Sequence, residues 1–491
     1  MRSVAFTLGA AISAAAAAVD APSFLSATHW APCYYISPLP SLWDGCAALA
    51  RTGTTSIKLI LAADPDGTYP WNTDWNPIMA NVTTLADLAA TNLYDTAFRG
   101  RSTEPAWGYT TFAVITYALQ TGGFTYWCDA FTDADAAFET AEFAGLTKHF
   151  LTAFAGSQKR FMLEHWEGDW SARCGSYDGS KPASPAVQLR MTQWLQARQD
   201  GVEAGRAQWC REARPAGVDC GARDAGAAIH AAAGVEVFHA SEVNLVLNAM
   251  TTGFPDNILK VIPYVRLDMV SYSSYDTMAL SPGFADALDF IAAHHNRTAA
   301  SPTPAVFVAE FGVAQNEEST ENLIAVYNNV VRWAASTNPA TGVQRASNVF
   351  AWELFDNEVN PSKQFPGGRC NAATGPQFNA SDLHGFWMIR PDGSPAPNFY
   401  WMQAIINGSA PLPQPPSGPT QCAQSPGFDD NTDGFGTTVA TQDDCCSECG
   451  GNMRCRAAVF VPNAPKTSQN CWIKLGVDPV AKKDVVLLVP K

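Results

Sequence analysis

Two glutamates that follow apolar runs are the residues best able to do chemistry in this chain of 491 residues. Glu310 closes the apolar run 305–309. Glu164 directly follows the apolar run 161–163, and Glu167 comes three residues later. A carboxylate at the end of an apolar strand is costly to bury unless it has a partner or a task. Two carboxyl groups that flank one bond are what glycoside hydrolysis requires, one as acid and the other as nucleophile or base.

Four tryptophans fall at the ends of the same kind of apolar run, namely Trp30, Trp166, Trp170 and Trp352. Indole faces pack on the C–H-rich faces of sugar rings, while nearby polar groups take the hydroxyls. Taken singly, a tryptophan is more often part of a core, and a strand-end glutamate is often half of an ion pair. Their coincidence at one edge of a fold predicts a carbohydrate polymer as the partner.

The elements that must bring these residues together are eight short β-rich runs, at 24–30, 56–61, 111–117, 160–166, 235–239, 269–273, 305–311 and 348–352. Helical patterns with apolar residues at i, i+3 and i+4 lie between them, for example at 133–154, 185–207, 282–295 and 319–335. This alternation predicts an α/β fold, a closed (β/α)8 TIM barrel, whose strands all end at one catalytic mouth. A doubly wound open sheet is the alternative, but the Gly-rich nucleotide turn that usually marks it is absent from the sequence.

The segment 308–312, Val-Ala-Glu-Phe-Gly, resembles the nucleophile strand of the clan A glycoside hydrolases, the cellulase-like retaining enzymes. The resemblance implies that Glu310 is the nucleophile and that Trp352 is the strand-eight tryptophan that floors the sugar site. It also implies that Tyr272 or Tyr275 is the strand-six tyrosine that hydrogen-bonds the nucleophile.

Strand four departs from that pattern, because Trp166-Glu167 stands where the clan has Asn-Glu. Glu167 is the first candidate for the acid/base and Glu164 the second, and Asn244 after strand five is a candidate for the missing amide. A retaining mechanism predicts that the Glu167 and Glu310 carboxyls lie ~5–5.5 Å apart. We further expect a raised pKa at Glu167 and an ionised Glu310.

Other chemistries find less support in the sequence, and no metal or cofactor is expected. The eight histidines are scattered without the H-E-x-x-H spacing, and the G-x-S-x-G turn of serine hydrolases is missing. A barrel that binds sugar without cutting it remains the alternative to an enzyme. The net charge of −15 argues against nucleic acid as a partner.

Residues 1–21 have the layout of a secretory signal peptide: Arg2, an apolar run from Val4 to Val19, and small residues near Ala21. We therefore expect an exported, extracellular protein, and no later segment reaches the ~18 apolar residues of a membrane span. Export permits disulfides. It also makes the four N-x-S/T sites, Asn81, Asn296, Asn379 and Asn407, candidate glycan acceptors.

The chain is expected to divide into a barrel at 22–407, a Pro-rich linker at 408–421 and a small domain at 422–491. Six cysteines crowd into the small domain: Cys422, Cys445, Cys446, Cys449, Cys455 and Cys471. Stapling by disulfides suits a domain of this size in an exported chain, although a zinc site that includes Cys446 and Cys449 is an alternative.

The spacing of these cysteines, with Trp472 after the last of them, resembles the PAN/Apple module. That family packs a cysteine-bearing helix on a small antiparallel sheet and binds carbohydrate or protein. The resemblance implies bridges from Cys445 or Cys446 to Cys471 and from Cys449 to Cys455.

Overall fold

The computed structural model describes residues 19–62, 68–71, 79–119, 121, 123–222, 224–360 and 378–414, together with the backbone of five strands between 422 and 490. Of the predicted signal peptide at 1–21, residues 1–18 lie outside the described residues. Among the described residues, no helix combines the length and the apolar character needed to cross a membrane.

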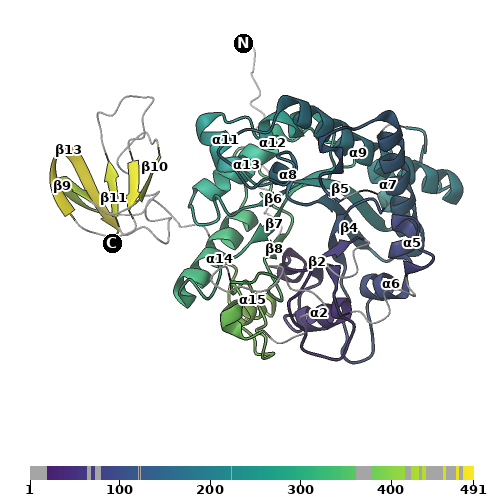
Figure 1. The fold of residues 1–491 in the computed structure, drawn as a ribbon, viewed down its shortest axis with the longest axis horizontal. Coiled ribbons are helices and arrows are strands. Elements are labelled where there is room, and N and C mark those ends of the chain that lie inside the picture. Colours follow the sequence, from purple (N-terminus) through teal and green to yellow (C-terminus); the bar gives the residue numbers. More distant parts are fainter. Residues whose placement is uncertain are drawn as a thin grey trace, which may run out of the picture.

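Eight parallel strands close into a barrel in sequence order, with β8 paired back to β1 (Figure 1). They are β1 Leu25–His29, β2 Ser56–Leu61, β3 Thr111–Thr116, β4 Lys159–His165, β5 Val235–Val243, β6 Met269–Ser273, β7 Val306–Phe311 and β8 Val349–Ala351. All eight predicted strands are confirmed, and so is the closed barrel over the open sheet. The fifth strand runs to Val243, four residues beyond its predicted end at 239.

Helices cover the outside of the barrel, as Figure 1 shows for α2, α9 and α14. The described helices are α1 Ala21–Phe24, α2 Ser41–Ala50, α5 Leu85–Ala89, α6 Asn92–Arg99, α7 Asp133–Ala153, α8 Gly168–Ser171, α9 Pro185–Ala213, α10 Gly226–Ala233, α11 Val246–Thr252, α12 Asn257–Lys260, α13 Gly283–His294, α14 Thr320–Ala335 and α15 Pro397–Ile406. Short 3-10 turns lie at Tyr126–Cys128, Ile262–Tyr264 and Ala380–Asp382.

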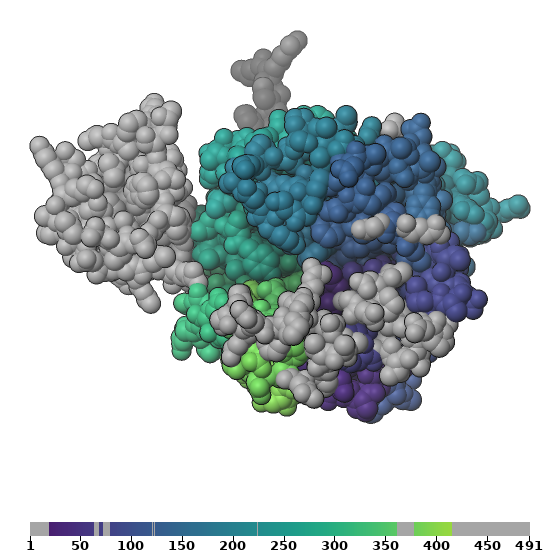
Figure 2. All heavy atoms as spheres, in the orientation of Figure 1, coloured from purple at the N-terminus to yellow at the C-terminus, as the bar shows by residue number. Residues whose placement is uncertain are grey.

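The two longest helices begin where their capping residues place them. Thr132 and Asp135 form a capping box at the start of α7, and Ser184 caps α9 ahead of a proline in its first turn. Helices α7 and α9 pack against each other, and both contact β5 on the outside of the barrel. They belong to the blue and teal surface in the upper part of Figure 2.

The inside of the barrel is filled by its own apolar layer, as expected for a barrel of eight strands. Its members are Ala113, Met162, Phe238, Ala240, Met269, Phe307, Ala309 and Phe350. Two residues further along β4 and β5, the inward positions become Glu164 and Glu242, so the layer toward the carboxyl ends of these strands is charged.

Disulfides tie several loops to the barrel. Cys128 is bonded to Cys174 and Cys210 to Cys220, and Cys33 is disulfide-bonded as well, whereas Cys46 is a buried free thiol. The asparagines of all four N-x-S/T sites are exposed.

The C-terminal strands form an antiparallel sheet in the order β10-β12-β11-β13-β9. Their bounds are β9 Cys422–Asp430, β10 Gly434–Thr437, β11 Ala457–Phe460, β12 Cys471–Lys474 and β13 Pro479–Pro490. An antiparallel sheet agrees with the expectation for this region. The helix expected around Cys445, Cys446 and Cys449 falls at 438–456, outside the described residues together with Cys455, and the side chains of Cys422 and Cys471 are not described.

Candidate active site

A lysine inside the barrel holds three glutamates together. Lys58, at an inward position of β2, has its Nζ 3.1 Å from Glu164, 3.3 Å from Glu310 and 3.5 Å from Glu242. All four side chains are essentially shielded from solvent. Burial disfavours the cation, but the three carboxylates outweigh it and raise the pKa of Lys58 above its ordinary value. The single cation of Lys58 thus forms ion pairs with acidic groups from β4, β5 and β7.

Glu310 reaches this cluster through an irregularity in β7. Phe307 and Ala309 face the interior, so simple alternation would turn Glu310 outward. The pairing of β7 with β6 shifts between Tyr272 and Ser273, and its pairing with β8 shifts between Val308 and Phe311. Such irregularities re-aim side chains beside active sites, and here Glu310 contacts Lys58 inside the barrel.

The two oxygens of Glu310 have different partners. Oε1 accepts a hydrogen bond of 2.6 Å from the indole Nε1 of Trp166 and lies 3.3 Å from Lys58 Nζ. Oε2 accepts only a longer bond of 3.3 Å from the hydroxyl of Ser273 among the described residues. Burial raises the pKa of Glu310, while Lys58 and the Trp166 donor oppose that rise. Oε2 is therefore the less engaged oxygen.

Glu167 lies just beyond the end of β4, in a left-handed backbone conformation with φ 58°. Its backbone N–H donates a 2.9 Å bond to Oε1 of Glu242, which fixes the turn. Its side chain is buried, and burial followed by the negative charge of Glu310 raises its pKa to about 8. The raised pKa agrees with the expectation from the sequence and keeps this carboxyl protonated near neutral pH.

Glu164, the second acid/base candidate, has no exposed surface and lies 3.1 Å from Lys58 Nζ. It supports the lysine from within the barrel. Between the two candidates, the structure places Glu167 nearer to the open end.

Glu242 and Lys58 are site residues that the sequence analysis missed. Burial and then the charge of Glu310 raise the pKa of Glu242 well above its ordinary value, against the opposing charge of Lys58. Lys58 could have been recognised in the sequence, because it is the one charged residue of the predicted strand 56–61. Glu242 carried no such sign because the predicted strand ended at 239.

Asn244 follows β5 as expected, but its amide is engaged within the protein. Its Nδ2 donates 3.2 Å to Glu242, and its Oδ1 accepts 3.1 Å from the backbone N–H of Asp169. The asparagine therefore braces the β4 and β5 ends, and its expected contact with sugar stays a prediction.

Three of the four predicted tryptophans form one cluster beside Glu310. The ring centroids of Trp30 and Trp166 are 4.5 Å apart, those of Trp30 and Trp352 6.0 Å, and those of Trp166 and Trp352 6.5 Å. Phe124 adds a fourth ring, 5.9 Å from Trp166. Trp170 lies apart from them and contacts Tyr177 at 5.4 Å.

Of the two tyrosines expected as the partner of the nucleophile, Tyr272 does not bond it, and the alternative, Tyr275, stays a prediction. Tyr272 is fully buried, and its hydroxyl hydrogen-bonds Asp276 and Thr277, which hold it away from Glu310. The nearer hydroxyl on β6 is that of Ser273. Tyr275 is 40% exposed, with its ring 6.5 Å from that of Phe386.

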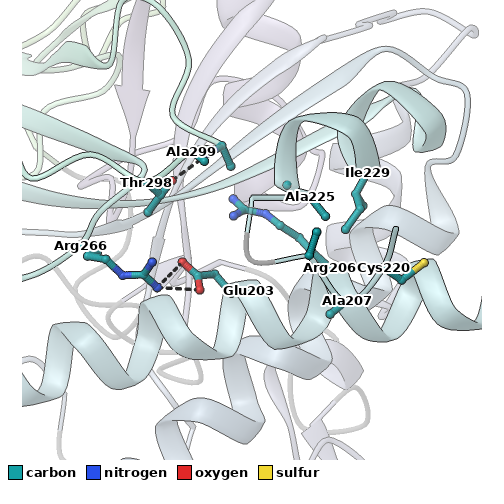
Figure 3. Close-up of a pocket in the computed structure, with 12 residues that line it drawn as sticks. Glu203, Arg206, Ala207, Cys220, Ala225, Ile229, Arg266, Thr298 and Ala299 are labelled. Atoms are coloured by element: carbon teal, nitrogen blue, oxygen red, sulfur yellow. Dashed lines mark hydrogen bonds and ion pairs between the residues drawn. The ribbon is translucent and has the colours of Figure 1, made fainter. Parts of the chain in front are cut away.

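In the described part of the chain, no group of three His, Cys, Asp or Glu side chains is arranged to hold a metal ion. A separate small cavity of about 40 Å³ lies beside α9, where Glu203 pairs with Arg266 (Figure 3). Thr298 and Ala225 on its wall precede β7 and β5, so the cavity lies toward the amino ends of the strands. It is too small for a sugar ring and belongs to the end of the barrel opposite Glu310.

No protein-family model and no curated protein matches the chain. Solved structures with a similar fold include a glycoside hydrolase family 5 subfamily 18 protein from Streptomyces cattleya in complex with Manb1-4GlcNAc. The two chains share 10% identity over 80% of this chain and 83% of that chain, with a TM-score of 0.42. A subfamily 18 protein from Bifidobacterium longum subsp. infantis shares 13% identity over 81% of each chain, with a TM-score of 0.43. A family 39 glycoside hydrolase from Bacteroides cellulosilyticus WH2 shares 10% identity over 96% of this chain and 82% of that chain, with a TM-score of 0.40. At these values the likeness carries no argument about activity, which depends on the residues of this chain.

Proposed function

We propose that this protein is a glycoside hydrolase that cleaves O-glycosidic bonds of a polysaccharide by a retaining mechanism. The supporting observation is the pair Glu167 and Glu310, which come from different strands at the carboxyl ends of one barrel and have unlike environments. Lys58 and Trp166 stabilise the anion of Glu310, whereas burial keeps Glu167 protonated with a pKa of about 8. An anionic nucleophile beside a neutral acid is the protonation state that the first step needs.

In that step, Oε2 of Glu310 attacks the anomeric carbon and forms a glycosyl ester. The bond from the anomeric carbon to the leaving oxygen breaks, and that oxygen takes the proton of Glu167. Oε1 becomes the carbonyl oxygen of the ester and keeps its donors, Trp166 and Lys58. The asymmetry between the two oxygens is what favours attack by Oε2.

In the second step, water attacks the anomeric carbon of the ester. Glu167, now a carboxylate, accepts a proton from that water, and Glu310 leaves as a carboxylate. Both groups return to their starting states, and the configuration at the anomeric carbon is retained.

The cluster of Trp30, Trp166 and Trp352 is proposed to floor the sugar that carries the anomeric carbon. Its position against Glu310 supports this role, because indole faces pack on pyranose rings. Carbohydrate, rather than nucleic acid, is the proposed partner.

Export and the appended module are part of the same proposal. We infer a signal peptide at 1–21, a barrel domain at 22–407, a linker at 408–421 and a PAN/Apple-like domain at 422–491 that binds glycan or protein. The disulfides in the barrel and the exposed N-x-S/T asparagines fit an extracellular protein. A binding module on a spacer would raise the effective concentration of the barrel on a polymer.

The test is turnover of a panel of β-glucans, mannans and xylans by wild type and Glu310→Gln. We expect wild type to release reducing sugar from one polymer class and Glu310→Gln to lose that activity. NMR of the first product should show retention of the anomeric configuration. Binding of a panel polymer without release by wild type would instead support the alternative, an inactive carbohydrate-binding barrel.

A further inference from the structure

Glu242, at the last inward position of β5, contacts both halves of the proposed catalytic pair. Its side chain has no exposed surface. Its Oε1 accepts the backbone N–H of Glu167 at 2.9 Å, and its Oε2 lies 3.5 Å from Nζ of Lys58. Lys58 in turn lies 3.3 Å from Oε1 of Glu310. One carboxyl group therefore links the backbone of the proposed acid to the cation beside the proposed nucleophile.

Glu167 needs such a contact because its backbone is in a strained conformation. A residue other than glycine with φ 58° is unfavourable, and it persists only where surrounding contacts hold it. The pairing of β4 with β5 ends at His165 and Ser241, so the strand ladder does not reach Glu167. The bond to Glu242 ties the N–H of Glu167 to the neighbouring strand in place of that ladder.

The rest of the turn 167–169 is fastened to the same strand end. Asn244 accepts 3.1 Å from the N–H of Asp169, and the carboxylate of Asp169 accepts 2.8 Å from the N–H of Asn244. A Cβ at Gly168 would lie 2.0 Å from the backbone oxygen of Glu242, so the turn and β5 are in close contact. These bonds hold the backbone after Glu167, whereas Glu242 holds Glu167 itself.

The reach of Glu242 matters more to this arrangement than its charge. Lys58 lies nearer to Glu164, at 3.1 Å, and to Glu310, at 3.3 Å, than to Glu242. Its cation is therefore paired without Glu242. The hydrogen bond to the N–H of Glu167 instead requires an oxygen at the end of a side chain as long as that of glutamate.

We propose that Glu242 is a positioning residue for the acid: by accepting the N–H of Glu167, it holds the Glu167 carboxyl where it can protonate the leaving oxygen while Glu310 attacks. This inference rests on the proposed function. Glu242 is buried beneath the turn and acts through Glu167, since catalytic groups displaced by about 1 Å can lose ~10²-fold in rate.

Two variants separate reach from charge. Glu242→Gln keeps the length and an acceptor oxygen but removes the charge. Glu242→Asp keeps the charge but lacks one methylene group, so its oxygens fall short of the N–H of Glu167. Gly168→Ala tests the same contact from the other side, because the added Cβ pushes the turn away from β5.

Each variant is assayed on two substrates with the same glycon, a hexasaccharide of the polymer class that wild type hydrolyses and the matching disaccharide fluoride. Departure of fluoride needs little help from an acid, so only the hexasaccharide reports the position of Glu167. For Glu242→Asp and Gly168→Ala we expect kcat on the hexasaccharide to fall about 10–100-fold and kcat on the fluoride to stay within about threefold. Glu242→Gln should stay within about threefold of wild type on both.

Glu142→Asp is the matched control. Glu142 is also a buried glutamate whose carboxylate accepts a backbone N–H, that of Leu85 at 2.9 Å, but it lies on α7 outside the barrel. Its shortening should leave both substrates within about twofold of wild type. In the Glu167→Gln background, Glu242→Asp should add less than about twofold on the hexasaccharide, because the acid that it positions is already missing.

Equal losses on the two substrates for Glu242→Asp and Gly168→Ala, or a larger selective loss for Glu242→Gln than for Glu242→Asp, would overturn the positioning role and leave the proposed function standing. Wild type that turns over neither the hexasaccharides nor the fluorides of the glucan, mannan and xylan series would contradict the proposed function itself, and the positioning role with it.

Discussion

The indole N–H of Trp166 donates a 2.6 Å hydrogen bond to Oε1 of Glu310. The residue that stands in place of an expected asparagine thus contacts the proposed nucleophile directly. Together with Lys58 it supplies the donors that favour the anion in a site where burial opposes charge. This contact, and the unlike environment of Glu167, lead to four predictions.

The first concerns the acidic limb of the activity profile. Trp166→Phe keeps a ring but removes the donor, so the pKa of Glu310 should rise and the acidic limb of kcat/KM should move to higher pH. Hydrogen bonds to charged groups are worth enough for a shift of roughly 1–2 pH units. Trp30→Phe alters the same cluster without touching Glu310 and should leave the position of the limb in place. An acidic limb of Trp166→Phe that coincides with wild type would show that the indole donor does not stabilise the anion.

The second concerns the basic limb, which should report Glu167. Because the acid must be protonated, kcat/KM should fall as pH rises through about 8. Tyr177→Phe removes a group that lowers the Glu167 pKa, so the limb should move to higher pH. Glu167→Gln should lose roughly 10²–10⁴-fold on oligosaccharides but far less on a glycosyl fluoride, whose departure needs little acid help. Equal losses on both substrates would argue against Glu167 as the acid.

The third concerns stability. The pKa of Glu167 is about 8 in the folded protein, above the ordinary carboxyl value of 4.5. Between these values the unfolded chain releases a proton that the folded protein keeps, so this group makes wild type less stable as pH rises. Glu167→Gln removes that dependence and should stabilise the protein at pH 7 by ~2 kcal/mol. Thermal unfolding of wild type and Glu167→Gln at pH 5 and pH 7 would measure this gain in stability. A gain that is the same at both pH values would contradict the raised pKa of Glu167.

The fourth concerns Lys58. Lys58→Met leaves Glu164, Glu242 and Glu310 buried without their cation, and removal of one partner of a buried ion pair costs about 3–5 kcal/mol. Urea unfolding should show this loss. Lys148→Met is the matched control, because it breaks the exposed pair with Glu212 and should cost less than about 1 kcal/mol. Similar losses for the two variants would mean that Lys58 does not neutralise the cluster.

The pattern of the sequence was sufficient to predict the barrel. Strands such as 56–61 and 269–273 begin and end where expected, and the helices capped by Thr132 and Ser184 begin at 133 and 185, as predicted. These features are local, since alternating apolar runs, helical periodicity and capping residues act within a few residues of each other. Glu310 and Glu167 were likewise selected as candidates from their positions at strand ends.

The partners of these residues depend on contacts between strands far apart in the chain. The closure of the barrel brings Lys58 to Glu310 across 252 positions, and the irregular pairing of β7 turns Glu310 inward where alternation would turn it out. Burial in that closed interior, with one lysine for three carboxylates, shifts the pKa values and leaves Tyr272 bonded elsewhere. The sequence by itself determined which elements form and which carboxylates end them. Only the tertiary structure decided which groups share a charge, because that depends on distance and on exclusion of water.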